Sequence, residues 1–301
     1  MTQPNRQVAA SVHAADTAGG ERSIAIICGG GSFPAAVADA AKRHGRRPVM
    51  LAIKGWAEPN VIEQYAHHWV ALGQGGRLIR LARQEGCREA VFIGTLLRPR
   101  LKQIRLDWLT LRSMPRIIGS FRGGDDRLLS GVASLFEEGG LRIVGIREVA
   151  PEIFAPEGTL GRQQASGRDH ADIARALKVI TALGPFDVGQ AAVVADHNVL
   201  GIEAAEGTDN LLLRIAELRR QGRVTTPPGV GVLVKAPKPA QDRRFDLPAI
   251  GPQTVHNAAG AGLAGVAVAA GNTIIAEASE VVAAADRAKI FIVGVREDAT
   301  R

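Results

Sequence analysis

A charged, proline-rich stretch, "KAPKPAQDRRFDLPAIG" at 235–251, lies between two apolar runs of the sequence. Its seventeen residues include three prolines, two lysines, two arginines and two aspartates. Unpaired charges at this density cost too much to bury, so we expect a surface loop. Each proline fixes its own φ, and a loop stiffened in this way loses little conformational entropy when it binds a ligand.

The charged side chains of this loop suit chemistry at a phosphate. Lysine and arginine bind phosphate oxygens, and aspartate carboxylates suit Mg²⁺ better than Zn²⁺. The candidates are Lys235, Lys238, Arg243 and Arg244 for the substrate, with Asp242 and Asp246 for the metal. The loop also follows an apolar strand-like run, and α/β proteins place their ligands at such strand ends. A loop held together by internal salt bridges would have the same composition, so both interpretations stay open.

A second candidate is the glycine-rich segment "CGGGSFP" at 28–34, between an apolar run and an alanine-rich helical pattern. Free N–H groups at the start of a helix form an anion site, which makes Gly30, Gly31 and Ser32 candidate ligand contacts. The segment matches neither the dinucleotide-binding G-x-G-x-x-G pattern nor the phosphate-binding G-x-x-x-x-G-K-[ST] pattern. A tight turn that packs helix closely on strand explains the glycines equally well.

Polar residues at the ends of other predicted elements are similarly ambiguous. Asp125, in "GGDDRLL", either caps a helix or faces a metal or a sugar hydroxyl. Thr208 is the predicted N-cap of a helix that runs to about 221, and Asp209 follows it just past a strand end. Gln190, at the edge of a predicted strand, is either a ligand contact or a loop glutamine with local partners.

The elements that must position these residues alternate between strand and helix. In the first half, strands are predicted at 23–28, at 47–53, in the run that starts at His67 and precedes a turn at 73–76, at 89–94 and at 141–146. Their alternation with helices indicates a parallel sheet. The prolines and glycines of 150–161 interrupt the alternation. The second half predicts a hairpin turning at 196–198, strands at 229–234, 265–270, 272–277 and 289–295, and helices at 170–183, 254–262 and 278–288.

We therefore expect an α/β protein of two domains, an N-terminal Rossmann-like parallel sheet at 21–158 and a C-terminal mixed α/β catalytic domain at 159–301. Residues 1–20 are expected to form a disordered tail, and they lack the apolar core of a signal peptide. The two cysteines form no disulfide framework, which favours the cytoplasm.

The segment 98–122 carries seven basic residues and one acid, Asp107. Leu101, Ile104, Trp108 and Leu111 fall at helical spacing, with basic residues on another face. This pattern predicts an amphipathic helix that ends near 115 and lies at a membrane surface. A surface helix packed on its own domain, or at a dimer contact, is the alternative.

The net charge of +7 and the pI of about 10 favour an anionic partner. Nucleic acid is not expected, because aromatic residues make up only 4% and no stacking or zinc-finger pattern occurs. An anionic membrane surface and a phosphorylated substrate remain.

Taken together, the motifs resemble a known family. The segments occur in one order: "IAIICGGGSFP", "GGDDRLL", "DVGQAAVV", "GIEAAEGTD", "LVKAPKPAQDRRFDLPAIGPQT" and "AGLAGVAV". Over residues 23–295 the chain resembles the LpxI-type UDP-2,3-diacylglucosamine pyrophosphatases, most specifically in the loop K-A-P-K-P-x-Q-x-x-R-x-D-x-P-x-I-G.

The resemblance implies hydrolysis of UDP-2,3-diacylglucosamine to UMP and 2,3-diacylglucosamine 1-phosphate (lipid X) in lipid A biosynthesis. It implies a divalent cation, usually Mg²⁺, two domains with the acylated UDP-sugar between them, and a homodimer in the cytoplasm, with peripheral contact to the inner membrane left open. A nucleotide-sugar transferase or dehydrogenase, or a carrier of an acylated sugar phosphate, is the alternative.

The resemblance also implies roles for residues. Asp246, in "RFDLP", matches the catalytic aspartate and metal ligand of the family. The implied substrate contacts are Gly30, Gly31, Ser32, Gly94, Thr95, Asp125, Gln190, Thr208, Asp209, Lys235, Gln241 and Arg244. Residues 101–121 would supply an apolar groove for the acyl chains.

Overall fold

A computed structural model describes residues 22–96, 104–113, 125–239, 242–244 and 247–297, and only the backbone of 125–130. The N-terminal half forms a parallel sheet in the order β3-β2-β1-β4-β5, as the alternation predicted. Its strands are β1 (Arg22–Cys28), β2 (Arg46–Ile53), β3 (Ala66–Val70), β4 (Glu89–Ile93) and β5 (Arg142–Ile143). The last strand is shorter than the predicted 141–146, because a helix starts at Ile146.

Helices cover both faces of this sheet because its central strand is apolar on both sides. Ile24, Ile26 and Cys28 of β1 pack into one core, while Ala25 and Ile27 pack into another. The helices of the first face are α1 (Phe33–Arg43), α2 (Pro59–Ile62) and α6 (Ile146–Val149); those of the second are α3 (Gly75–Gln84) and α5 (Asp125–Glu138). The β1 sequence thus alternates between two cores with the two-residue period of a strand.

The C-terminal half forms a mixed sheet in the order β6-β13-β11-β9-β7-β8. The strands are β6 (Gly158–Leu160), β7 (Ala191–Ala195), β8 (Asn198–Ile202), β9 (Val232–Lys235), β11 (Gly265–Ala269) and β13 (Phe291–Val295). One face packs on α7 (Gly167–Leu183), and the other on α8 (Gly207–Arg220), α9 (Pro252–Gly260) and α10 (Ala278–Ala288). The fold is therefore the predicted α/β class with a parallel and a mixed sheet.

The predicted hairpin is confirmed at its turn. Asp196 and His197 adopt positive φ angles of 51° and 64°, as a two-residue turn between twisted antiparallel strands requires. The buried carboxylate of Asp172, on α7, accepts hydrogen bonds from the N–H groups of both residues, at 2.9 and 2.7 Å. These bonds fix the turn and satisfy a buried charge.

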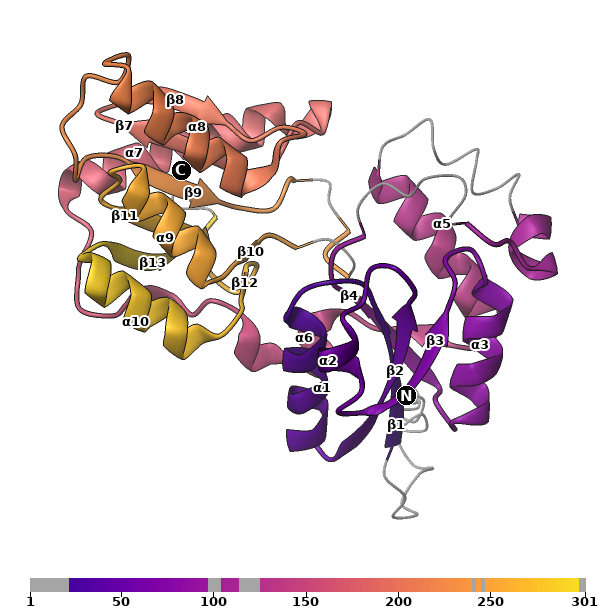
Figure 1. The fold of residues 1–301 in the computed structure, drawn as a ribbon. Helices are drawn as coiled ribbons and strands as arrows, with labels where there is room; N and C mark the ends of the chain where they lie inside the picture. The colour runs from indigo at the N-terminus through magenta and orange to yellow at the C-terminus, as the bar shows by residue number, and fades with distance from the viewer. Residues whose placement is uncertain (1–21, 97–103, 114–124, 240–241, 245–246, 298–301) are drawn as a thin grey trace, which may run out of the picture.

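A small parallel pair of strands, β10 (Ala249–Ile250) and β12 (Ile274–Ile275), lies between the two halves (Figure 1). Ile274 belongs to the core of the N-terminal half, and Leu247 and Ala249 pack against the same core. The linking segment contains the 3-10 helix η2 (Pro151–Ile153), after which Phe154 pairs with Ile274. The end of the charged loop is therefore anchored in the first half of the chain.

The segment predicted as one amphipathic helix differs from that prediction. Of the described residues 104–113, 108–113 are helical and 104–107 are not, and Arg105 donates its N–H to the carbonyl of Leu72 at 2.8 Å. Asp107 starts the helix, because its carboxylate accepts the N–H of Thr110 at 2.9 Å, as an N-cap does. The prediction of a continuous helix over 101–111 was wrong over 104–107, and Leu101 lies outside the described residues.

Among the helices that the structure describes, none is long and apolar enough to cross a membrane.

Candidate functional site

The carboxyl ends of parallel strands in both halves carry the candidate residues. In the N-terminal sheet, β1 leads to Gly29–Gly31, β4 to Gly94–Thr95 and β5 to Val144–Gly145, at one edge. In the C-terminal sheet, β9 ends at Lys235 and β8 leads to Glu203. Ligands of α/β proteins bind at such edges.

Arg244, in the charged loop, contacts both halves of the chain. Its guanidinium donates to Asp242 Oδ2 at 2.9 Å, and its Nη1 lies 3.5 Å from Glu137 Oε1 on α5. A Cβ placed on Gly145 would sit 3.7 Å from the Cα of Arg244, so the loop runs in contact with the carboxyl edge of the N-terminal sheet. The charged loop and the glycine-rich edge thus belong to neighbouring surfaces.

Arg244 and Asp242 shift each other's titration. The hydrogen bond from Arg244 lowers the pKa of the Asp242 carboxyl, which outweighs the opposite effect of burial. The same hydrogen bond raises the pKa of Arg244. Asp242 is therefore an ionised partner of an arginine, which fits the salt-bridge interpretation for this one aspartate.

Lys235 lies at the end of β9 and is only 8% exposed. Its ammonium donates to Thr208 Oγ1 at 2.8 Å and to the carbonyl of Ala249 at 2.9 Å. Thr208 Oγ1 in turn donates to Glu203 Oε1 at 2.6 Å, and Glu203 Oε2 accepts the N–H of Gln190 at 3.0 Å. Five residues from four separate segments of the chain thus form one hydrogen-bonded group.

Thr208 is not the N-cap that the sequence predicted. Helix α8 starts at Gly207 after the N-cap Glu206, and Thr208 lies inside the first turn. Its hydroxyl is used by Glu203 and Lys235 instead. Asp209 beside it accepts a hydrogen bond from Asn257 of α9 at 2.9 Å.

The other cations of the loop have carboxylate partners. Lys238 is paired with Asp187, and Arg243 with Glu297 at 2.9 Å. Glu297 also accepts from Asn272 at 2.6 Å, and Asn272 Oδ1 accepts from Arg147 of α6 at 3.1 Å. This second chain of contacts, separate from that of Arg244, also joins the two halves of the protein.

The glycine-rich turn is closely packed against the end of β4. Gly30 and Thr95 exchange two backbone hydrogen bonds of 3.0 Å, and Gly29 donates to the carbonyl of Ile93 at 3.0 Å. A Cβ on Gly29 would lie 2.4 Å from the carbonyl oxygen of Thr95, and one on Gly94 would lie 2.8 Å from that of Gly30. Close packing therefore explains Gly29 and Gly94, and the N–H of Gly30 already has an acceptor.

Past that pairing, Gly31 has a positive φ of 91°, and Ser32 is the N-cap residue of α1. Gly31, Ser32 and the first turn of α1 therefore lie past the backbone pairing of Gly30 with Thr95. Of the remaining predicted contacts, Asp125 opens α5, while Gln241 and Asp246 lie outside the described residues.

The charged loop has carboxylates of the kind that bind Mg²⁺, but the described residues hold no large cluster of metal ligands. In the described ranges, no group of three or more histidine, cysteine, aspartate or glutamate side chains could hold a metal ion. Mg²⁺ does not need such a cluster, because it binds through one or two carboxylates and the phosphates of its substrate. Since Asp242 is paired with Arg244, Asp246 is the better candidate for that carboxylate.

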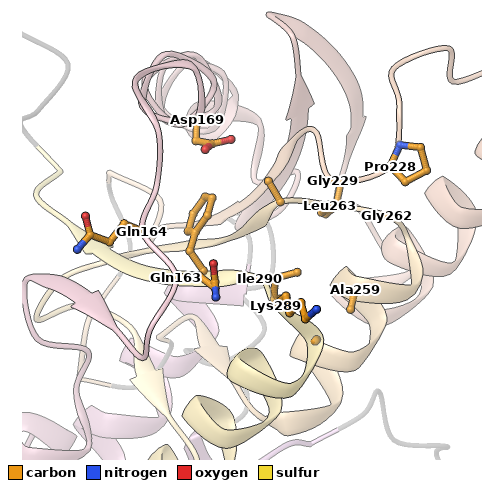
Figure 2. A pocket seen from close by; sticks show the side chains of 13 residues that line it. Gln163, Gln164, Asp169, Pro228, Gly229, Ala259, Gly262, Leu263, Lys289 and Ile290 are labelled. Carbon is orange, nitrogen blue, oxygen red and sulfur yellow. The ribbon is translucent and has the colours of Figure 1, made fainter.

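A cavity of about 330 Å³ lies elsewhere, at the amino ends of β11 and β13 (Figure 2). Gln163, Asp169 and Lys289 are among the residues around it. Because β9 is parallel to β11, Lys235 lies at the opposite edge of the same sheet. The cavity is therefore separate from the hydrogen-bonded group of Lys235.

Three residues of the site region were not among the predicted contacts. Glu203 carried a signal, since it follows a predicted strand closely. Glu137 and Asn272 carried none, because their partners are 107 and 125 residues away in sequence. Only the folded chain brings them together.

The family comparisons cover both halves of the chain. The model "LpxI N-terminal domain" matches residues 23–153, and the model "LpxI C-terminal domain" matches residues 156–293. A protein of Caulobacter vibrioides named "UDP-2,3-diacylglucosamine pyrophosphatase LpxI" is 39% identical over 274 residues, which span 91% of this chain and 98% of that protein. The chain belongs to the LpxI family.

Proposed function

We propose that this protein hydrolyses UDP-2,3-diacylglucosamine to UMP and 2,3-diacylglucosamine 1-phosphate in lipid A biosynthesis, in the cytoplasm. The similar protein of Caulobacter vibrioides carries the name of that activity. The observation that supports it most is the contact of Arg244 with the N-terminal half, because it brings a cationic loop to the glycine-rich sheet edge. A pyrophosphate between two such edges would meet donors from both.

The loop supplies the charge that the substrate needs. Lys235 and Arg244 would bind pyrophosphate oxygens, as guanidinium and ammonium groups commonly do. On the opposite side, Gly31 and Ser32 present the start of α1, where backbone N–H groups and the helix dipole favour an anion. The remaining substrate contacts are proposed at Gly30, Gly94, Thr95, Asp125, Gln190, Thr208, Asp209 and Gln241.

Asp246 is proposed as the catalytic residue and as the ligand of a divalent cation, with Mg²⁺ preferred. When bound, the cation supplies a positive charge that offsets the charge growing on the departing phosphate. The protein's own contribution is to orient the pyrophosphate with Lys235 and Arg244. Fixed cations of this kind stabilise a phosphoryl-transfer transition state without rearranging.

An exposed apolar surface supports a peripheral contact with an anionic inner membrane. Trp108 is 76% exposed, and Leu106, Leu109 and Leu111 are exposed beside it. Arg105 and Arg112 flank them as exposed cations. We call Arg105–Arg112 the apolar–basic segment, because it combines interfacial side chains with charges that anionic lipids attract.

We further propose a homodimer of two-domain subunits, divided into 21–158 and 159–301 as predicted from the sequence. Sedimentation equilibrium would give twice the chain mass of 31.7 kDa if the dimer forms. A single-chain mass across micromolar concentrations would contradict it.

The function is tested by incubating the purified protein with UDP-2,3-diacylglucosamine and Mg²⁺, with no acceptor present. We expect UMP and 2,3-diacylglucosamine 1-phosphate in equal amounts. A transferase would release UMP only with an acceptor, and a carrier would bind the substrate without cleaving it. Either of these results would contradict the proposal.

A further inference from the structure

Glu203 lies just past the end of β8, and Lys235 lies at the end of β9 at the same edge of the sheet. The bridge between them is Thr208, whose Oγ1 lies 2.6 Å from Glu203 Oε1 and 2.8 Å from Lys235 Nζ. Glu203 therefore acts on the lysine through a hydroxyl.

The direction of these hydrogen bonds is fixed by chemistry. An ionised carboxylate only accepts, and an ammonium only donates. The single proton of the Thr208 hydroxyl must therefore point to Glu203, and its lone pairs face Lys235. The ammonium also donates to the carbonyl of Ala249 at 2.9 Å, so Thr208 Oγ1 and this carbonyl both help to fix its place.

The surroundings of Glu203 are rigid. Its second carboxylate oxygen accepts the N–H of Gln190 at 3.0 Å, and its own N–H donates to Ala191 at 2.9 Å. A Cβ on Gly189 would lie only 2.2 Å from the carbonyl oxygen of Glu203, so this close approach requires glycine. The carboxylate thus has little freedom to move away from Thr208.

The burial of Lys235 gives this arrangement an energetic role. An ammonium that is 8% exposed has lost most of its hydration, and a nearby carboxylate offsets part of that cost. Glu203 supplies negative charge to the ammonium of Lys235 from one hydroxyl away, through Thr208.

We infer that Glu203 is a positioning residue, which through Thr208 sets the place of the Lys235 ammonium for a phosphate group of the substrate. The inference rests on the proposed function for the identity of that phosphate. The competing explanation is that Glu203 only stabilises the local structure where β7 begins, β8 ends and α8 begins.

A double-mutant cycle separates the two explanations. Glu203→Ala is made alone and in a Lys235→Ala background, and Glu206→Ala serves as the matched control. Glu206 is a carboxylate three positions along the chain that instead bonds Arg214 and the N–H of Ala204. The readouts are kcat and KM for the substrate, the Kd for inorganic pyrophosphate, and Tm.

If Glu203 acts through Lys235, Glu203→Ala should weaken pyrophosphate binding and kcat/KM about tenfold or more, as expected for the loss of a charged hydrogen-bond partner. The same change should have less than about a threefold further effect once Lys235 is alanine, since coupled residues are not additive. Glu203→Gln, which keeps an oxygen for Thr208, should recover part of the loss. Glu206→Ala should stay within about threefold of the unchanged protein.

The inference would be overturned if Glu203→Ala lowered pyrophosphate affinity and kcat/KM by the same factor with and without Lys235. It would also be overturned if Glu203→Ala lowered Tm but left pyrophosphate affinity unchanged. If Glu203→Ala does not fold, Glu203→Gln is carried through the same cycle. Failure of the unchanged protein to release UMP would contradict the proposed function, while the pyrophosphate cycle would still decide the role of Glu203.

Discussion

Arg244 in the C-terminal half and Glu137 on α5 in the N-terminal half approach to 3.5 Å and so link the two halves of the chain. Both side chains are substantially exposed, so the pair adds little to stability, in the range of about 0–1 kcal/mol. The functional consequence of this ion pair is the position of the Arg244 guanidinium. A cation that reaches both halves is available to a ligand bound between them.

Replacing Arg244 should therefore affect activity more than stability. We expect Arg244→Ala to lower kcat/KM about tenfold or more, because a charge-assisted contact with phosphate is lost, with a change in unfolding free energy below ~1 kcal/mol. Arg243→Ala is the matched control, since Arg243 is similarly exposed but pairs with Glu297. Equal activity of the two variants would argue that Arg244 only braces the loop.

The glycine-rich turn gives a prediction about packing. A Cβ on Gly29 would lie 2.4 Å from the carbonyl oxygen of Thr95, which cannot be accommodated without moving the backbone. Gly29→Ala should cost about 1–3 kcal/mol of unfolding free energy, measured by urea denaturation. Gly167→Ala, at a helical position with open space around it, should leave stability unchanged or raise it by up to about 1 kcal/mol. Similar effects at both positions would contradict the packing argument.

Most of the longer β-strands were predictable from sequence, because apolar runs bounded by glycine, proline and helical patterns indicate them, whereas the short strands β6 and β10 were not predicted. The run Ser23–Cys28 and the glycines after it predicted β1 and its turn. The site edge then followed from the rule that parallel strands share their carboxyl ends.

The predictions that failed concern residues whose structure depends on partners distant in sequence. Thr208 is of a residue type that often caps helices, but its hydroxyl donates to Glu203 and accepts from Lys235, which is 27 residues away. The helix over 101–111 was predicted from apolar spacing alone. Residues 104–107 are instead not helical, because the N–H of Arg105 bonds the carbonyl of Leu72 and Asp107 caps a helix that starts at 108. The assignment of Asp246 stays a prediction, because it lies outside the described residues.

Acid should weaken the protein partly through Glu152. Burial by itself raises the pKa of this carboxyl. The hydrogen bond from its backbone N–H and those from Arg43 and His44 have a larger, opposite effect and bring the pKa down to about 2. Because the folded pKa lies below the unfolded value of 4.5, ionised Glu152 adds to the free energy of unfolding above about pH 4.5. This stabilisation is lost as the pH falls toward 2.

Glu152→Gln removes that titration. Between pH 5 and 2, its unfolding free energy should fall less steeply with pH than that of the unchanged protein, in matched denaturant titrations. Parallel stability curves for the two proteins would show that these contacts do not lower the pKa of Glu152.

The apolar–basic segment should respond to the charge of a lipid surface. Reversing Arg105 and Arg112 to glutamate should weaken binding to vesicles of phosphatidylglycerol and phosphatidylethanolamine about tenfold or more, given about 1 kcal/mol for each basic residue. The control is Arg175→Glu with Lys178→Glu, two exposed cations of α7 that give the same change in net charge. Co-sedimentation that falls equally in both pairs would show non-specific attraction rather than docking through this segment.

The central claim is metal-assisted hydrolysis that depends on Asp246, and a single-turnover measurement of Asp246→Ala at saturating Mg²⁺ tests it most directly. If the carboxylate holds the cation, the rate should fall several hundred-fold, which corresponds to about 3–4 kcal/mol of lost transition-state stabilisation. Substrate affinity should be better preserved than the rate, and the unfolding free energy should change by less than ~1 kcal/mol. A near-normal single-turnover rate would contradict the account, as would a combined loss of affinity and Tm without a specific loss of rate.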